Sequence, residues 1–570
     1  MRIHIYNPEH DYALASGSPY YTPPVEVRAM RDAQALLPLM WADAGDAIIV
    51  PDNIEYQEVP SSPGIELVRW SRLREYLSSQ RQVEFSPWGW DSMVRLKLLS
   101  NGANESLLPS EEWIRSLRAL SHRRTSISFN ARLNRYLDEA GLCRHISELP
   151  VEFYDTDEAL RWLDSAGEAF FKAPWSSAGR GVQSSVGLDR EIHIRPWLHG
   201  MIRRQGSVIG ETIFPKHIDF ATEWYVDQSP ANGPEVSFLG LSVFETSARG
   251  KYHGNRKMTR NLARRYINSI APDFNGKFIE AQRKAIIDIL EEQPESTRYN
   301  GYIGIDMMAS RDGQIRGGVE LNFRRTMGIP PADVMIIGCG NVGSHLKRAF
   351  SGAGIRCGIV SSRSKIFPPA EVYIIAVKDE SIAEVARKLI PIDGSIVCHT
   401  SGSIPVQVLR DALPAGTRHG VFYPLQTFSK NVEMPYDEIP FLIEGDSPDV
   451  TDELMRLAGH VSRNVREAGS AERAEYHLAA VLSCNFTNHL CTLADRYLSS
   501  RGLDFRMLLP LMCQTVSKLR HTSPADAQTG PAARGDLNVI KSHLSKLEDF
   551  PEIRAIYSLL SDSILDSRQP

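Results

Sequence analysis

The sequence lacks the features that mark membrane, secreted and nucleic-acid-binding proteins. No uninterrupted apolar run approaches the ~20 residues that a membrane-spanning helix needs. The N-terminus, MRIHIYNPEHDYALAS, does not show the basic and then apolar pattern of a signal peptide. The formal net charge of −5 gives no electrostatic reason to expect nucleic acid as a partner. We therefore expect a soluble, cytoplasmic protein that binds neither membranes nor nucleic acid.

Two further absences concern cysteine pairs and phosphate loops. The seven cysteines include no CxxC pair, and an odd number fits reduced cytosolic thiols better than a disulfide framework. The pattern GxxxxGK[ST] is also absent, so a nucleoside triphosphate would have to be held by another type of loop.

The sequence pattern changes near Pro330 and Pro331. This is a natural domain boundary, because proline can neither continue a helix nor donate a backbone hydrogen bond within a central strand. Before this point, runs such as ATEWYVD and SFLGLSVFE alternate apolar and polar residues and indicate antiparallel strands. After it, short apolar strands alternate with helical stretches, which is typical of a parallel α/β sheet. From about residue 470 the pattern is helical. We predict four domains, with boundaries at 1–124, 125–329, 332–468 and 469–570.

Polar residues in two neighbouring strands suggest a metal-nucleotide site. Asp306 lies in GIDMM, and Glu320 and Asn322 lie in VELNFRR. Residues two apart on a strand share a face, so Glu320 and Asn322 can hold one ion that Asp306 reaches across the hairpin. Oxygen ligands of this kind suit Mg²⁺, and Arg324 can neutralise a transferring phosphate. A solvated polar face is the alternative, but it explains the alignment of these residues less well.

The segment FKAPWSSAGRGV has the composition of a phosphate-binding loop. Lys172 ends a strand, and small residues follow it from Ser176 to Gly181. Backbone N–H groups of such a loop can approach phosphate oxygens while the ammonium supplies a point charge. A simple surface hairpin explains this segment alone equally well.

Taken together over residues 125–328, these motifs resemble the ATP-grasp superfamily. The resemblance implies ATP and Mg²⁺ as cofactors, and an acyl phosphate that an amine or thiol attacks. It assigns the nucleotide hinge to Glu211 and metal ligation to Asp306, Glu320 and Asn322. It assigns phosphate contacts to Lys172, Ser176, Ser177, Gly179, Arg180 and Gly181. The family's second lysine has no clear counterpart, with Arg123 and Arg124 as the nearest candidates, and the chain leaves the fold soon after Arg325.

The preceding domain, residues 1–124, is expected to help bind substrate. NPEHDYALA follows the first strand, where α/β folds place ligand contacts, and it offers Asn7 and Asp11 as substrate-binding residues beside Glu9 and His10. A self-satisfied turn that caps a helix is the alternative.

The sequence GCGNVG, between an apolar strand and an amphipathic stretch, indicates a dinucleotide site. Gly338 would make the tight turn, Gly340 would admit the pyrophosphate and Gly343 would let the helix pack on the strand, with Asn341 and Val342 between them. The second strand ends in Ser361, Ser362 and Arg363 rather than in an acid, which favours NADP(H) over NAD. Val377, after the third strand, would pass beneath the nicotinamide.

Further candidates follow later strands and helices. Ser401 in HTSGS and Gln426 in HGVFYPLQTF are candidate substrate contacts, as are Thr529 and Arg534 in QTGPAARGD. His477 and Asn485 belong to a polar stripe on the first long helix. For the histidines of HTSGS and HGVFYPLQTF, a core or capping role is the favoured alternative.

Across nearly all of 333–566, the motifs GCGNVG, HTSG, YPLQTFS, YHLAAVLSCN and TGPAARGD resemble an uncharacterised NADP-binding Rossmann-like family with a helical domain of unknown function. That family looks related to pyrroline-carboxylate reductase and ketopantoate reductase. The resemblance implies an NADP-linked reductase and a homodimer through the helices. Relatives often place a lysine or asparagine on this helix to polarise a carbonyl. No lysine is present here, so Asn485 and His477 are our catalytic candidates, with Arg324 in the other half.

The predicted fold is thus multidomain α/β: an ATP-grasp-like α+β half, a Rossmann dinucleotide-binding domain and an all-α C-terminal domain. The expected function is a fusion of an ATP-dependent carboxylate ligase with an NADP-dependent oxidoreductase, both acting on small molecules. One alternative is a reductase whose N-terminal half only binds a ligand. Another is a non-enzymatic sensor of nucleotides.

Overall fold

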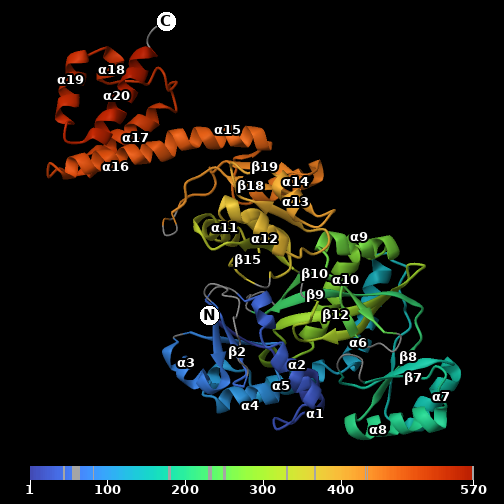
Figure 1. Cartoon of the computed structure of the whole chain (residues 1–570). Helices are drawn as coiled ribbons and strands as arrows, with labels where there is room; N and C mark the ends of the chain where they lie inside the picture. The colour runs from blue at the N-terminus through green and yellow to red at the C-terminus, as the bar shows by residue number, and fades with distance from the viewer. Residues whose placement is uncertain are drawn as a thin grey trace. The chain divides into compact units, whose positions relative to one another are not determined.

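The computed structural model divides the chain into two compact units, Met1–Ser470 and Ala471–Pro570 (Figure 1). It describes residues 1–42, 45–53, 65–80, 82–176, 181–228, 234–247, 252–328, 331–364, 367–429, 432 and 434–567. Over these ranges, no helix has both the length and the apolar composition to cross a membrane. The predicted boundary residue Pro330 lies outside the described residues, and the first strand after it begins at Ala332.

The first unit begins with a parallel four-stranded sheet of order β3-β2-β1-β4. Its strands are β1 (Arg2–Ile5), β2 (Ala47–Val50), β3 (Glu66–Arg69) and β4 (Glu84–Pro87). The helices of this region are α1 (His10–Ser16), α2 (Val25–Ala33), α3 (Leu73–Ser79), α4 (Ser92–Ser100) and α5 (Glu111–Leu120). Asp91 fixes the start of α4 by accepting a hydrogen bond from the Val94 N–H. The residues that follow β1 lie at the edge of the sheet where its parallel strands end.

A small antiparallel sheet of order β5-β8-β6-β7 follows. Its strands are β5 (Val151–Phe153), β6 (Ala169–Lys172), β7 (Val182–Ser184) and β8 (Val208–Thr212). Helices α7 (Thr156–Ala166) and α8 (Arg195–Gln205) share an apolar core with it, formed around Phe171 and Leu198. Its central pair, β6 and β8, carries Lys172 and Glu211.

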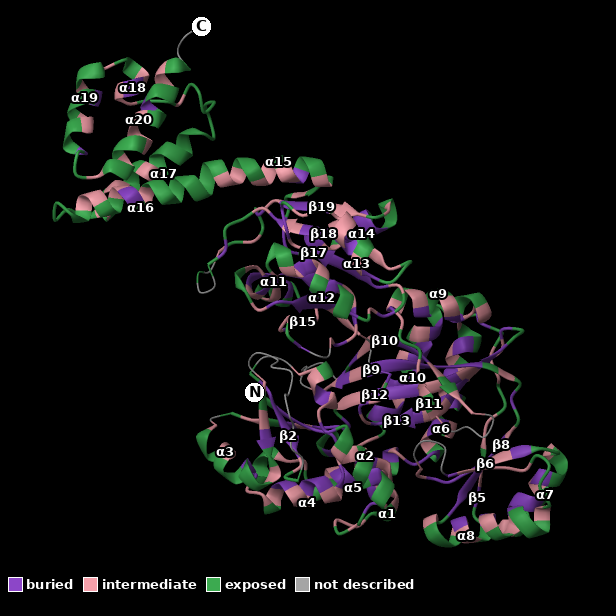
Figure 2. Cartoon of the chain, viewed as in Figure 1, coloured by how far each residue is buried: buried purple, intermediate pink, exposed green. Residues whose placement is uncertain are grey.

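The larger antiparallel sheet has the order β11-β10-β9-β12-β13. Its strands are β9 (Lys216–Asp227), β10 (Glu235–Thr246), β11 (Tyr252–Asn255), β12 (Gly301–Ser310) and β13 (Ile315–Asn322). Helices α6 (Arg124–Glu139), α9 (Arg260–Ile270) and α10 (Gly276–Glu291) contribute to its core, which includes Phe129, Trp224 and Phe278. Figure 2 shows that β9, β12 and β13 are largely buried. One face of the sheet packs on helices, so the polar residues that alternate along these strands lie together on the other.

After Pro331 a seven-stranded sheet has the order β15-β14-β16-β17-β18-β19-β20. Its strands are β14 (Ala332–Ile337), β15 (Cys357–Val360), β16 (Ala370–Ile375), β17 (Ile396–His399), β18 (Arg418–Pro424), β19 (Phe441–Gly445) and β20 (Val465–Glu467). Helix α11 (Asn341–Gly352) lies between β14 and β15, α12 (Ile382–Lys388) between β16 and β17, α13 (Gln407–Ala412) between β17 and β18, and α14 (Pro448–Gly459) between β19 and β20. Strands β14 to β18 are parallel, and β19 runs antiparallel to β18. Alternate residues of β14 enter two different cores, which explains its continuous apolar sequence.

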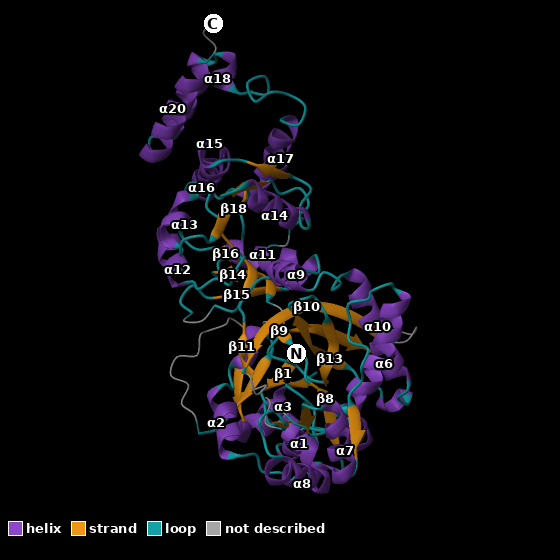
Figure 3. Cartoon of the chain, turned by 90° about the vertical axis from the view of Figure 1, so that its right-hand side faces the viewer, coloured by secondary structure: helices purple, strands orange, loops and turns teal. Residues whose placement is uncertain are grey.

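The described part of the second unit consists of helices, drawn in purple in Figure 3. They are α15 (Ser470–Ala480), which starts at the unit boundary, a π-helical turn (Val481–Asn485), α16 (Phe486–Ser499), α17 (Leu509–Lys518), α18 (Pro531–Arg534), α19 (Leu537–Lys546) and α20 (Pro551–Asp566). Few of its apolar side chains are buried; Leu493, Ala532, Ile540 and Leu547 are among them.

Candidate functional sites

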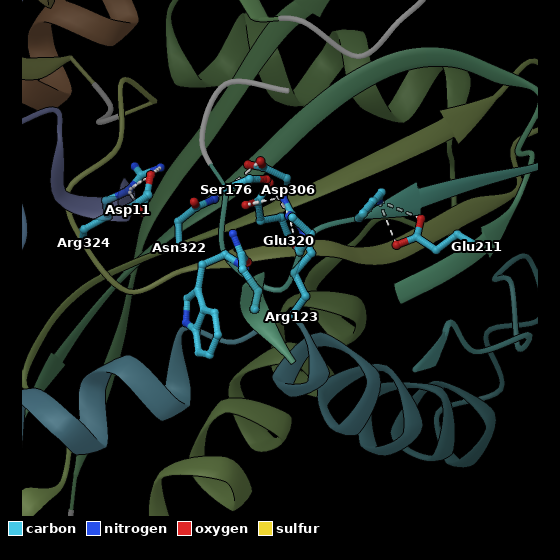
Figure 4. A network of polar contacts seen from close by, with 12 residues as sticks. Asp11, Arg123, Ser176, Glu211, Asp306, Glu320, Asn322 and Arg324 are labelled. Atoms are coloured by element: carbon cyan, nitrogen blue, oxygen red, sulfur yellow. Dashed lines mark hydrogen bonds and ion pairs between the residues drawn. The ribbon is translucent and has the colours of Figure 1, made fainter. Parts of the chain in front are cut away.

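The hairpin β12–β13 brings the three predicted metal ligands together (Figure 4). Its register sets Asp306 opposite Glu320 and Gly304 opposite Asn322, and the Asn322 amide donates to Asp306 Oδ2 at 3.4 Å. Burial, and then the Glu320 carboxylate, raises the pKa of Asp306 to about 7. Two carboxylates that disfavour each other's charge would be relieved by a cation between them.

The donor set fits Mg²⁺ only if other oxygens complete the coordination. Among the residues that the structure describes, no group of three or more His, Cys, Asp or Glu side chains forms a metal site by itself. Two carboxylates and one amide oxygen are hard donors, and Mg²⁺ in nucleotide sites takes its remaining ligands from phosphates and water. The residues therefore suit a metal that arrives with a polyphosphate.

Arg123 connects this hairpin to the start of the Ser/Gly-rich segment. Its guanidinium donates to Glu320 Oε1 at 2.7 Å and to Ser176 Oγ at 2.7 Å, and it also donates to the Ala173 carbonyl at 2.6 Å. The Arg123 side chain is only 6% exposed. The structure thus places a buried cation between the two predicted nucleotide-binding segments, at one of the two positions that the sequence offered in place of the family's second lysine.

Lys172 and Glu211 form a buried ion pair on neighbouring strands. The Lys172 ammonium donates to both carboxylate oxygens of Glu211, at 2.8 and 2.7 Å, and the two side chains are 9% and 7% exposed. Arg316 lies 3.6 Å from the same carboxylate. A small pocket, lined by Glu211, Arg316 and Asn130 among others, adjoins the pair. The predicted phosphate lysine and the predicted hinge acid are thus direct partners.

Of the loop between β6 and β7, Ser177, Gly179 and Arg180 lie outside the described residues. Its two ends meet, because the Ala173 N–H donates to the Gly181 carbonyl at 2.7 Å. A side chain at Gly181 would collide with Ser176 and Ala173. Glycine is therefore required where the loop closes.

Arg324 forms an ion pair with Asp11. The sequence predicts Arg324 as a catalytic residue and Asp11, separately, as a substrate-binding residue. Arg324 Nε donates to Asp11 Oδ1 at 3.1 Å, and its Nη2 donates to Oδ2 at 3.0 Å. Asp11 lies in α1 and Arg324 follows β13, so this pair joins the first sheet to the acidic hairpin. In Figure 4 it lies on one side of the metal-ligand candidates, with Glu211 on the other.

Asn7 and His10 support a turn. The Asn7 amide donates to the Gly89 carbonyl at 2.8 Å and to Asp91 Oδ2 at 3.1 Å. A side chain at Gly89 would collide with the His10 ring. The side chains of Asn7 and His10 thus contact the segment around Gly89 and Asp91, whereas Asp11 points to Arg324.

Glu223 is a buried acid of this face that sequence reasoning missed. It lies on β9 opposite Gly304, and Thr326 donates to its Oε2 at 2.9 Å. Burial raises the pKa of Glu223 to about 8. The alternation in ATEWYVD marks Glu223 as one of a strand's polar residues, but only the pairing of β9 with β12 places it beside the hairpin.

In the seven-stranded sheet, five predicted residues follow the carboxyl ends of five parallel strands. Each lies one or two residues beyond β14, β15, β16, β17 or β18: Gly338, Ser361, Val377, Ser401 and Gln426. Because parallel strands end at the same edge, all five come to that edge. The strand order reverses direction at β14, which is where such folds bind ligands.

The glycine loop at this edge requires its glycines. Gly338 has a φ of 124°, and a side chain there would collide with the Ala376 carbonyl. A side chain at Gly343 would collide with the Gly338 carbonyl, while Gly340 directly precedes α11 and has open space. The Asn341 amide donates to the Phe428 carbonyl at 2.8 Å, so this side chain orients the loop from within.

The segment after β15 is open to a ligand. Arg363 is exposed, and its N–H donates to Ser361 Oγ at 3.2 Å, with Ser362 between them. By contrast, Ser401 Oγ accepts hydrogen bonds from the N–H groups of Ser403 and Ile404, so it orders its own turn.

The remaining candidates belong to the helical unit and are described within it. His477 lies half-buried on α15, and Asn485 is exposed at the end of the π-helical turn, a feature common at functional sites. Arg534 is exposed in α18. Thr529 lines a largely apolar pocket with Tyr497 and Tyr557.

Comparisons with known proteins match different parts of the chain. A proposed NADP oxidoreductase from Bacteroides fragilis is 36% identical, over 41% of this chain and 98% of that chain, with a TM-score of 0.39. Pyrroline carboxylate reductase from Plasmodium falciparum, with NADP bound, is 13% identical. The match covers 41% of this chain and 98% of that chain, with a TM-score of 0.28. N5-carboxyaminoimidazole synthetase from Staphylococcus aureus, complexed with ADP, is 11% identical. The match covers 57% of this chain and 70% of that chain, with a TM-score of 0.31.

No curated protein matches the chain. A protein family does: residues 439–564 match the domain of unknown function DUF2520. That match extends from the strand β19 into the helix α20.

Proposed function

We propose that residues 1–328 catalyse an ATP-dependent ligation of the ATP-grasp type, in which a carboxylate is activated by phosphoryl transfer. The observation that carries this proposal is the register of β12 and β13, which sets Asp306 opposite Glu320 with Asn322 in hydrogen-bond contact. Arg123 ties that cluster to Ser176 at the start of the glycine-containing loop. Ser176 and Glu320, which are 144 residues apart, thus share one guanidinium.

In this proposal each side chain has an electrostatic role. Asp306, Glu320 and Asn322 would hold Mg²⁺, which when bound neutralises charge on the phosphates. Arg123 and Lys172 would each turn from a carboxylate to the incoming phosphates, because a guanidinium or ammonium can bind either anion. Arg324, oriented by Asp11, would stabilise charge on the transferring group.

The test is ADP formation by the full chain with Mg²⁺ and ATP. Glu320→Ala should lower the rate at least about 100-fold, because a metal ligand and the partner of Arg123 are lost together. Glu280→Ala, on the outer face of α10, is the matched control and should leave the rate unchanged. A wild-type chain that binds ATP without forming ADP in the presence of candidate carboxylates would favour a ligand-binding or sensing role.

A second activity is favoured by the edge of the seven-stranded sheet. We propose that residues 332–566 form an NADP-dependent oxidoreductase, with the pyrophosphate at Gly338–Gly343 and the 2′-phosphate at Ser361, Ser362 and Arg363. The positive φ of Gly338 and the closeness of Gly343 to its carbonyl support a loop that presents N–H groups to an anion. His477 and Asn485 are the proposed proton donor and carbonyl-polarising group. In a single pathway, a carboxylate activated in the first half would be reduced in the second.

The helical unit supports a homodimer. Leu478, Leu482, Phe486 and Leu490 recur every four residues, and their exposures are 56%, 57%, 54% and 39%. Such an exposed apolar stripe along one helix side supports the proposal of a homodimer contact. Leu482→Asp with Phe486→Asp should convert the dimer to a monomer in analytical ultracentrifugation. Ile390→Asp, at an exposed residue of the first unit, should not; a wild-type monomer at micromolar concentration would refute the dimer.

A further inference from the structure

A pocket lies at the carboxyl ends of β1 and β2, apart from the acidic hairpin. Apolar side chains form much of its wall: Ile5, Ala35, Ile49, Trp70, Met93 and Val94. Three charged residues, from three elements, line it as well: Glu9, Arg31 and Lys97. A concave apolar site with a few convergent charges is the usual form of a small-molecule site.

Glu9 provides one acceptor that the protein leaves unused. Its side chain is 3% exposed, and its Oε1 accepts a hydrogen bond from Arg31 at 3.1 Å. Its Oε2 is buried and has no hydrogen-bond partner within the described residues. A buried carboxylate oxygen without a donor is unfavourable, so a ligand that donates there would be bound strongly.

Lys97 provides the opposite charge. Its ammonium lies 3.9 Å from the centroid of the Trp70 ring, and no hydrogen bond or ion pair of this ammonium is found among the described residues. Burial, and then the neighbouring Arg31, lowers the pKa of Lys97 to about 8. An anion beside the ammonium would satisfy it.

The charges around the pocket balance. Arg31 and Lys97 are positive, Glu9 is negative, and Asp32 accepts a hydrogen bond from Arg31 Nε at 3.0 Å. A ligand with net charge would therefore leave one of these groups uncompensated in a poorly hydrated site. A ligand that carries one positive and one negative group compensates both Glu9 and Lys97.

We propose that this pocket binds an apolar amino acid as its zwitterion. The ligand's ammonium donates to Glu9 Oε2, its carboxylate lies beside Lys97, and its side chain packs against the apolar wall. Tyr6 also lines the pocket, and burial raises the pKa of its hydroxyl to about 12. The role of this amino acid as a substrate rests on the proposed ligase function, whereas its binding does not.

The test measures binding of three small molecules to the full chain by calorimetry, without ATP or Mg²⁺. L-leucine carries both charges, 4-methylpentanoate lacks the ammonium and 3-methylbutylamine lacks the carboxylate. Leucine should bind at least about tenfold more tightly than either analogue, because each analogue leaves one buried charge unpaired. Equal binding of leucine and either analogue, or no binding of leucine at millimolar concentration, overturns the proposal.

Two variants identify the site. Lys97→Met should reduce the affinity for leucine about tenfold and leave the affinity for 3-methylbutylamine unchanged. Glu9→Gln should reduce the affinity for leucine and leave the affinity for 4-methylpentanoate unchanged. Lys284→Met is the control, since Lys284 also lies over an aromatic ring, that of Tyr136, but on α10. If Glu9→Gln does not fold, the half-buried Lys97 still decides the question; an unchanged leucine affinity in Lys97→Met refutes the site.

The same measurement separates this proposal from the ligase. Glu320→Ala should bind leucine as the wild type does, because Glu320 does not line the pocket. If the wild type forms no ADP but binds leucine in this pattern, the ligase fails and the pocket stands. If it forms ADP but does not bind leucine, the reverse holds.

Discussion

The two proposed nucleotide sites in the first unit are built from different parts of the chain. The site around β12 and β13 consists of side chains: Asp306, Glu320 and Asn322 on a sheet face, with Arg123 across from them. The site after β14 consists mainly of backbone, where Gly338 and Gly343 keep side chains out of the way. The first site holds its charges in ion pairs before any ligand arrives, whereas the second holds open space at the start of a helix.

This difference predicts how each site fails. A side-chain site loses function by degrees, because a neighbouring group of the same charge can take over part of the interaction. A site built from backbone cannot be compensated in this way, because a side-chain carbon added at a glycine collides with a carbonyl whose position is fixed by the sheet. Three substitutions test this contrast, and each has a control variant that should behave differently.

Among these three substitutions, the largest effect is expected from Gly338→Ala. The new methyl group would collide with the Ala376 carbonyl, and the φ of 124° is itself unfavourable for alanine. Overpacking of this kind costs about 3 kcal/mol, so NADPH affinity should fall roughly 100-fold in fluorescence titrations. Gly354→Ala is the control, since Gly354 also has a positive φ, of 76°, but open space around it. If both variants bind NADPH as the wild type does, the loop is not the pyrophosphate site.

A smaller and graded effect is expected from Arg123. Arg123→Ala removes the group that contacts both Glu320 and Ser176, and it should lower ADP formation roughly 30-fold, corresponding to about 2 kcal/mol. Arg123→Lys should recover part of this loss, because a lysine keeps the charge but not the fork of donors. Arg124→Ala tests the neighbour, which points to Glu152 at 3.0 Å instead. An Arg124 effect as large as that of Arg123 would contradict the proposed role.

The same contrast explains what the sequence could predict. The glycine loop is local: Gly338, Gly340 and Gly343 lie within six residues, so the pattern itself predicts a strand, a turn and a helix, and β14 and α11 have these positions. The hairpin was also local, because β12 and β13 are consecutive and alternate in the expected way.

The rest depended on pairings between distant residues. The sequence offered both Arg123 and Arg124, and only the fold shows that Arg123 reaches Glu320, which lies 197 residues further along. The same applies to Arg324 and Asp11, which are 313 residues apart, and to Glu223, whose neighbour is set by the order of the strands. Asn7, which we predict to contact substrate, also donates to the Gly89 carbonyl, 82 residues away in the sequence. Hydrogen-bond partners at such separations leave no periodic signal in the sequence.

The smallest effect, and the one that sharpens the comparison most, is expected from Arg363. Its side chain is exposed after β15, so the fold does not need it, and Arg363→Ala should leave the melting temperature unchanged. Loss of one charge-assisted contact to a 2′-phosphate costs about 1.5 kcal/mol, so NADPH affinity should fall roughly tenfold while NADH affinity stays the same. Arg387→Ala, another exposed arginine of this domain, should affect neither. Equal losses for NADPH and NADH would show that Arg363 contributes general positive charge and does not select the phosphate. The preference for NADPH would then come from other residues at this edge of the sheet, where the proposed site consists mainly of backbone.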